Sequence, residues 1–165
     1  MRVLIASPFR SAYEPGPEDL GRALELAMRD HGHDVDAIRI PFDRNPQALW
    51  NQLLAFRLTD LTDGGELLVA TGTPCHLLRH PRKVLWLTEH YPWIEDGSPL
   101  LECLRAADFE ACREATAAFA ASRRLCNRIA HPSGCAVDLL SPPGRESWQA
   151  IVVALTGNDS TGSAR

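Results

Sequence analysis

Apolar residues follow one another along this chain in two alternating patterns. Short continuous runs have the length of buried strands, and between them apolar residues recur every three or four positions, as on one face of a helix. Strands that alternate with helices predict an α/β fold with a parallel sheet. The expected strands are Arg2–Ser7, Val35–Ile40, Glu66–Ala70, Lys83–Leu87, Thr116–Ala121 and Ala136–Leu140.

Five helices and one short helical turn are expected around these strands. Gly32 is well placed to end the first helix, and Asn45-Pro46 to begin the second as its cap and its first turn. We assign the apolar face of the second helix to Leu49, Trp50, Leu53, Leu54 and Leu61. The expected segments are Leu20–His31, Asn45–Leu61, the turn Pro74–Leu78, Leu100–Glu114, Ser122–Ala130 and Ser147–Leu155.

The 165 residues indicate one compact domain. We assign residues 1–143 to a single Rossmann-like domain and 144–157 to a closing helix. Residues 158–165 are small and polar, which predicts a disordered tail.

Composition and charge argue against several classes of protein, namely nucleic-acid-binding, membrane-spanning and secreted proteins. A net charge of −4 argues against nucleic acid as the main partner, and no apolar run reaches the roughly 18–20 residues of a membrane span. The first residues make a strand and lack the features of a signal peptide. The cysteines are odd in number and have no CxxC spacing, which predicts reduced thiols and a cytoplasmic protein. They are Cys75, Cys103, Cys112, Cys126 and Cys135.

The strongest chemical signal is the loop after the fourth strand. Ligands of parallel sheets bind at the carboxyl ends of the strands, and there the chain places a carboxylate, an imidazole, a phenol and an indole. Glu89 and His90 are candidate catalytic acids or bases, while Tyr91 and Trp93 are candidates for stacking on a ligand ring. The alternative is that the aromatic residues cover the sheet end and His90 is a solvated loop residue.

Two other segments should meet this edge of the sheet. The loop Ser7–Glu18 precedes a helix N-terminus suited to a phosphate, and Gly16 could approach that phosphate; the alternative is an ordinary connecting loop. Ser122 begins a helix and is followed by Arg123. We expect Ser122 to cap this helix, with a phosphate contact by Arg123 as the second possibility.

A metal site is not expected. His76 and His80 are four residues apart, but Pro81 follows them and no acidic third ligand stands at a motif spacing.

Several segments taken together resemble the N-terminal domain of family 4 glycosyltransferases of the two-domain GT-B type. The resemblance covers residues 1–143 and lies in the order and spacing of the segments. They are MRVLIASPF, PGPEDLGRALELAMRDHGHDV, TGTPCHLLRHPRKVLWLTEHYPW, FAASRRLCNRI and AVDLLSPP.

The resemblance implies a GT-B N-terminal half that binds the sugar acceptor, with Thr88, Tyr91 and Trp93 on the acceptor side. Nucleotide-sugar would be held mainly by a partner domain, and no other cofactor is implied. Three departures stand out. Pro17 replaces a glycine of the family's glycine loop, Thr88 stands where the family has a strand-tip histidine, and the 165 residues contain no second Rossmann domain. The closing helix resembles the one that returns from the second domain to the first.

Two functions follow from this pattern, and a third possibility is an unrelated small Rossmann-like protein that binds nucleotides. The first is an acceptor-binding half that needs a separate donor-domain subunit for sugar transfer and is inactive alone. The second is a non-catalytic binding or scaffold module that retains the fold, either binding a carbohydrate or pairing with another protein or as a homodimer through the face where the second domain would dock.

Overall fold

A computed structural model describes residues 1–9, 20–43, 45–91, 94, 98–133, 136–142 and 147–157. Its centre is a six-stranded sheet in which every paired strand is parallel, in the order β2-β1-β3-β4-β5-β6. The expected Rossmann-like α/β fold is therefore confirmed. The strands are β1 (Arg2–Phe9), β2 (Asp34–Pro41), β3 (Leu67–Ala70), β4 (Lys83–Leu87), β5 (Ala117–Ala120) and β6 (Asp138–Leu139).

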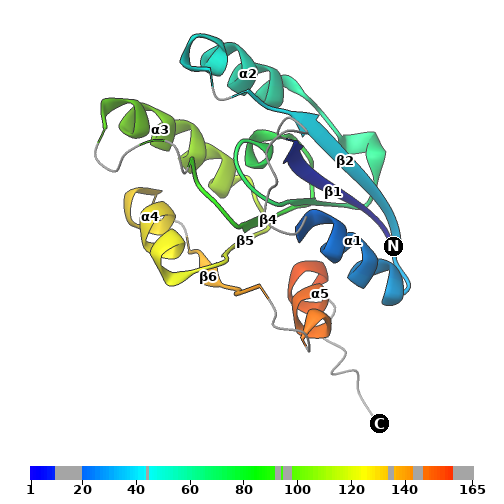
Figure 1. Ribbon diagram of the computed structural model, residues 1–165. Helices are drawn as coiled ribbons and strands as arrows, with labels where there is room; N and C mark the ends of the chain where they lie inside the picture. The colour runs from blue at the N-terminus through cyan, green and yellow to red at the C-terminus, as the bar shows by residue number, and fades with distance from the viewer. Residues whose placement is uncertain are drawn as a thin grey trace.

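Helices cover both faces of the sheet (Figure 1). On one face α1 and α5 pack against side chains such as Val3 and Ile5. On the other face α2, α3 and α4 pack against side chains such as Leu4 and Ala6, because successive strand residues point to opposite sides. The helices are α1 (Leu20–Asp30), α2 (Pro46–Leu58), α3 (Pro99–Arg113), α4 (Arg123–Ser133) and α5 (Trp148–Thr156), with 3-10 turns η1 (Thr62–Gly64) and η2 (Cys75–Leu77).

The expected helix boundaries are confirmed at several caps. Gly32 has φ +80° and lies just beyond α1, where the amide of His33 donates to the carbonyl of Met28. Asn45 caps α2 by accepting from the amide of Gln47 at 3.0 Å. Strand β6 has two residues instead of the expected five, because only Phe119 and Ala120 of β5 pair with it.

The expected apolar face of α2 is partly wrong. Leu49 and Leu53 are buried as expected, but the helix is rotated so that Phe56 completes the buried face. Trp50 and Leu54 instead point outward and are 51% and 57% exposed. Both residues lie one position beyond a buried leucine, so each is turned about 100° away from the core.

Helix α5 completes the cover of the α1 face. Ile151, Val152 and Leu155 are buried against the sheet. Trp148 meets Trp86 of β4 edge to face, with ring centroids 6.2 Å apart. The indole Nε1 of Trp86 donates to the carbonyl of Leu140 at 2.8 Å, so β4 also holds the segment that leads to α5.

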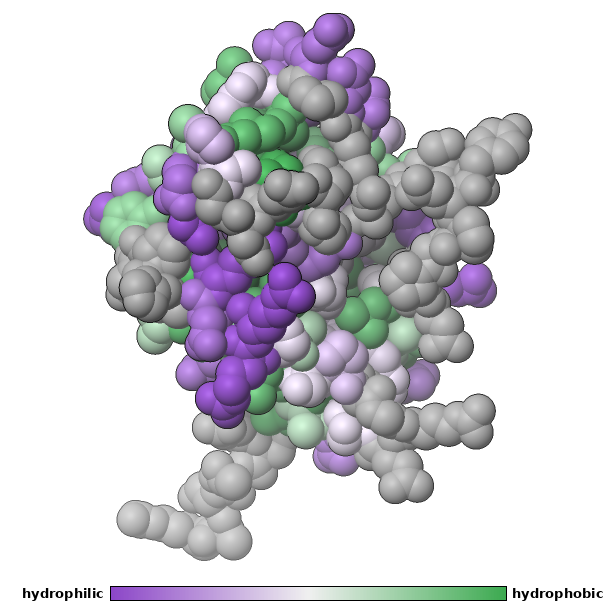
Figure 2. Space-filling model, turned by 60° about the vertical axis from the view of Figure 1, so that its left-hand side comes forward, coloured by the Kyte–Doolittle hydropathy of each residue, from purple (hydrophilic) through white to green (hydrophobic). Residues whose placement is uncertain are grey.

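The surface is mixed in character. Figure 2 shows polar and apolar side chains interspersed on the face that it presents. Within the described ranges, no helix has the length and apolar character needed to cross a membrane. The two edges of the sheet are β2, which carries Asp34, Asp36 and Arg39, and the two-residue β6.

Candidate functional site

The strand order changes direction between β1 and β3, so the carboxyl ends of these strands flank the topological switch point where α/β proteins bind ligands. Gly72 follows β3 with φ +135°, a conformation that side-chain-bearing residues rarely adopt. A Cβ atom at Gly72 would lie 3.7 Å from the ring of Pro8 and 3.9 Å from Cγ of Glu89. The ends of β1, β3 and β4 therefore converge here, and Glu89 lies at their junction.

Hydrogen bonds fix the loop that follows β3. The amide of Thr71 donates to the carbonyl of Ala6 at 2.9 Å, which continues the pairing of β3 with β1. The amide of Tyr91 donates to Oγ1 of Thr73 at 3.1 Å, which joins this loop to the one after β4. The Thr73-Pro74 peptide bond is cis. The two loops therefore form one connected rim beside Glu89.

A buried carboxylate lies beneath this rim. Asp108, in the middle of α3, accepts from two imidazoles, Nε2 of His76 at 2.5 Å and Nε2 of His90 at 2.6 Å. The hydroxyl of Tyr91 donates to the same carboxylate at 3.4 Å. All four residues are buried, the most exposed being Asp108 at 5%. Asp108 thus ties the loops after β3 and β4 to one helix.

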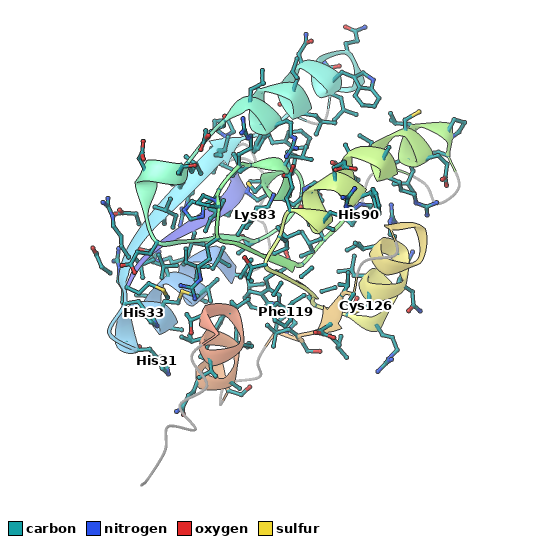
Figure 3. The ribbon with its side chains drawn as sticks, turned by 180° about the vertical axis from the view of Figure 1, so that it is seen from behind. His31, His33, Lys83, His90, Phe119 and Cys126 are labelled. Atoms are coloured by element: carbon teal, nitrogen blue, oxygen red, sulfur yellow. The ribbon has the colours of Figure 1, made fainter. Side chains whose placement is uncertain are left out.

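Arg128 of α4 adds a fourth element to this network. Its Nε donates to Nδ1 of His90 at 3.1 Å, and its Nη2 donates to the carbonyl of Ile94 at 3.3 Å. Because Nδ1 of His90 accepts, its proton is on Nε2, which faces Asp108. Both ring nitrogens of His90 are therefore engaged inside the protein, between α3 and α4 (Figure 3). Nδ1 of His76 is buried and has no hydrogen-bond partner among the described residues.

Burial by itself raises the pKa of Asp108, but electrostatic attraction and hydrogen bonds from His76 and His90 outweigh burial and lower this pKa to about 2. The carboxylate therefore stays ionised under all ordinary conditions. An ionised group shared by several donors is a rigid support, because each donor would lose its acceptor if the loop moved.

We predict an acid-sensitive contribution of Asp108 to stability. The pKa of Asp108 is 3.8 in the unfolded chain, where these partners are absent, and about 2 in the folded protein. As the pH falls, the carboxylate is therefore protonated in the unfolded chain before it is protonated in the folded protein. The contribution is complete above about pH 5, is lost progressively as the pH falls through 3.8 toward 2, and amounts to about 2 kcal/mol at 1.36 kcal/mol per pKa unit. Urea unfolding at pH 4, 3 and 2 would measure it. Asp108→Asn should lack this component, and parallel acid profiles for the two proteins would contradict the prediction.

Lys83 is a second buried charged residue, and it contacts the segment that follows β3. Lys83 is 0% exposed, and its Nζ donates to the carbonyls of His76 and Leu78 at 2.9 and 3.0 Å. Burial lowers the pKa of Lys83 to about 8 although Glu114, with Oε2 at 3.8 Å, acts in the opposite direction. Glu114 itself pairs with both terminal nitrogens of Arg57. Lys83 thereby holds η2 against the sheet (Figure 3).

The sequence-predicted site residues that the structure describes fall into three groups. Thr88 and Glu89 are half-buried at the switch point, whereas His90 and Tyr91 are enclosed below it. Ser122 accepts from the amide of Leu125 at 3.3 Å, which confirms its capping role, and Arg123 is exposed beside it. Neither shows a direct bond to Glu89. Gly16 and Trp93 lie outside the described residues.

Sequence reasoning missed the residues that support the rim, namely His76, Asp108 and Arg128. One signal was present: Asp108 shares the apolar stripe of α3 with Leu104 and Ala111, and a charge on a buried stripe implies buried partners. Among the described residues, no group of three His, Cys, Asp or Glu side chains is arranged to hold a metal ion. The four described cysteines are free thiols, and they are Cys75, Cys103, Cys112 and Cys126.

Comparison with known proteins does not assign the chain. No protein-family model matches it, and no curated protein is significantly similar to it.

Proposed function

We propose that this chain is the acceptor-binding half of a glycosyltransferase and that a separate donor domain supplies the nucleotide-sugar. The observation that carries the proposal is the position of Glu89, whose carboxylate-bearing side chain lies beside Gly72 and Pro8 at the switch point. Ligand sites of open parallel sheets lie at this place. The order of the glycosyltransferase-like segments in the sequence supports a sugar as the ligand.

The chemistry of the rim suits a polyhydroxyl ligand. A carboxylate accepts hydrogen bonds from neighbouring hydroxyl groups, and the hydroxyl of Thr88 can donate or accept. Gly72 has no side chain, so a ligand ring can approach the backbone closely there. Glu89 is therefore the group that receives the proton of the acceptor hydroxyl. In the transfer, the anomeric carbon breaks its bond to the diphosphate oxygen and forms one to the acceptor oxygen.

His90 has a different part in this proposal. Its two ring nitrogens bond Asp108 and Arg128, so it acts as a positioning residue that holds Glu89 in place. Thr88 occupies the strand tip, where the resembling family carries a histidine. Transfer then depends on a donor domain that closes over the rim, because the sugar donor must be enclosed and water excluded.

We expect Glu89→Gln to weaken carbohydrate binding at least tenfold, because an amide is a poorer acceptor for sugar hydroxyls than a carboxylate. The purified chain would be titrated with a panel of mono- and disaccharides and aryl glycosides by saturation-transfer NMR. Glu110→Gln is the matched control, since Glu110 is exposed near the C-terminal end of α3. This end of α3 leads into the start of β5 and lies away from the carboxyl ends of the strands.

Transfer is tested separately. A tagged full-length chain would be purified with its bound proteins and assayed with UDP-, GDP- and dTDP-sugars. Activity of the complex and none of the chain alone would support the two-component enzyme. If no carbohydrate binds, or if Glu89→Gln and Glu110→Gln bind alike, the proposal fails.

The second candidate is a non-catalytic carbohydrate-binding module. It is favoured by one observation, the enclosure of His90, which leaves no described imidazole at the rim. In that case the Glu89-dependent binding would persist, while no copurifying protein would confer transfer.

A further inference from the structure

The buried network around Asp108 contains two imidazoles whose second ring nitrogens have different surroundings. Nε2 of His76 and Nε2 of His90 both donate to the carboxylate of Asp108, so each neutral ring has its lone pair on Nδ1. Nδ1 of His90 accepts from Nε of Arg128 at 3.1 Å. Nδ1 of His76 is buried and has no hydrogen-bond partner among the described residues. The two histidines therefore differ at the nitrogen that would take up a further proton.

A further proton costs more at His90 than at His76. At His90 it would turn Nδ1 into a donor that points at the N–H of Arg128, so this hydrogen bond would be lost. It would also place a cationic ring against a guanidinium that is always charged, inside the protein. At His76 the proton displaces no described partner of Nδ1, and the imidazolium still pairs with the carboxylate of Asp108. The contacts therefore favour His76 as the site of protonation.

Three neighbours of the two rings keep their charge between pH 7 and pH 5. Asp108 stays ionised, since its pKa is about 2. Burial raises the pKa of the Cys75 thiol and of the Tyr91 hydroxyl, so both groups stay neutral. Glu89 precedes His90 in the chain but lies at the switch point. A change in the charge of the network in this pH range is therefore a change at an imidazole.

Lys83 approaches His76 from β4. Its Nζ donates to the carbonyl of His76 at 2.9 Å, and burial lowers the pKa of Lys83 only to about 8, so it is charged at pH 7 and below. Glu114, beside Lys83, stays ionised because the hydrogen bonds and charge of Arg57 lower the pKa of Glu114. A proton on His76 would give η2 a second positive charge next to that of Lys83. The new N–H would also have no acceptor among the described residues, so η2 must shift until this donor is satisfied.

We infer that His76 is an acid-responsive switch: it takes the first proton of the network and loosens the loop after β3, while Arg128 keeps His90 neutral and the loop after β4 in place. The loop after β3 contributes Gly72 and Thr73 to the rim, so acid would open the rim on one side. The switch does not depend on the proposed function, because it needs only the contacts of the buried network.

The first test follows the imidazole nitrogens of the full ¹⁵N-labelled chain by NMR from pH 7.5 to pH 5. We expect His76 to change from the neutral to the cationic pattern while His90 keeps the pattern of a neutral ring with its proton on Nε2. In Arg128→Met, His90 should also become cationic, because its Nδ1 no longer accepts from a guanidinium. A proton on His90 before His76, or no change at His76 by pH 5, would overturn the inference. So would a His90 that stays neutral in Arg128→Met.

Amide hydrogen exchange tests whether η2 responds to this proton. The amides of His76 and Leu77 donate to the carbonyls of Gly72 and Pro74. Their protection, corrected for the exchange rate of an unstructured chain, should fall at least about fivefold between pH 7 and pH 5. The amides of β4 should keep their protection, and an equal loss in β4 and η2 would contradict a local switch.

His76→Gln separates the switch from a general loss of stability. The glutamine amide can donate to Asp108 as Nε2 of His76 does, but it takes up no proton, so protection of Leu77 should no longer depend on pH. His31→Gln is the matched control, since His31 is exposed at the end of α1, and it should respond to pH like the unaltered chain. Equal pH responses of the two glutamine variants would refute the switch. If His76→Gln fails to fold, the NMR titration of the unaltered chain decides.

Discussion

Asp108→Ala is expected to lower the free energy of unfolding by about 3–5 kcal/mol, the cost of breaking a buried charged network by removing one member. The substitution leaves His76, His90 and the Tyr91 hydroxyl without their common acceptor inside the protein. Each unsatisfied buried donor is costly. Urea unfolding near neutral pH would measure the change.

The control for this prediction is Glu110→Ala. Glu110 lies two residues further along α3 but is exposed, so its removal should change stability by only about 0.5 kcal/mol. The loops after β3 and β4 should also become more mobile in Asp108→Ala. Faster amide hydrogen exchange at Tyr91, whose amide bonds Thr73, would report this effect. Similar losses of stability in the two variants would count against the network.

Trp86→Ala is the second change with a large expected effect, again about 3–5 kcal/mol. Trp86 is 0% exposed and lies under α5, where it contacts Trp148 and donates to the carbonyl of Leu140. Its loss opens a cavity and leaves that carbonyl without its donor. Thermal and urea unfolding would measure the effect.

Trp50→Ala provides a matched comparison. It removes the same side chain from the outward side of α2, so we expect a change of no more than about 1 kcal/mol. Increased protease cleavage around α5 in Trp86→Ala, but not in Trp50→Ala, would locate the damage. If both variants unfold alike, Trp86 does not dock α5.

The fold could be predicted from the sequence because each strand and helix has its own local pattern of apolar residues. Even β5 (AAFA), with its weak strand propensity, was identified from the helix start that follows it at Ser122. The orientation of α2 was less accessible. Leucine and tryptophan occupy both sides of this helix, so apolar spacing could not distinguish the buried side from the exposed one.

The candidate site was only partly accessible, for a physical reason. Glu89 could be placed because the end of a strand is a local property. The network that supports it joins His76, His90, Asp108 and Arg128, which come from four separate elements. Such contacts depend on tertiary packing. Only the position of Asp108 on an apolar stripe pointed to them.

The two sheet edges have a consequence for how copies of this protein associate. An unpaired strand edge is a template on which further strands can add without limit. Here β2 carries Asp34, Asp36 and Arg39, and β6 offers only two residues, so neither edge favours the growth of a fibre.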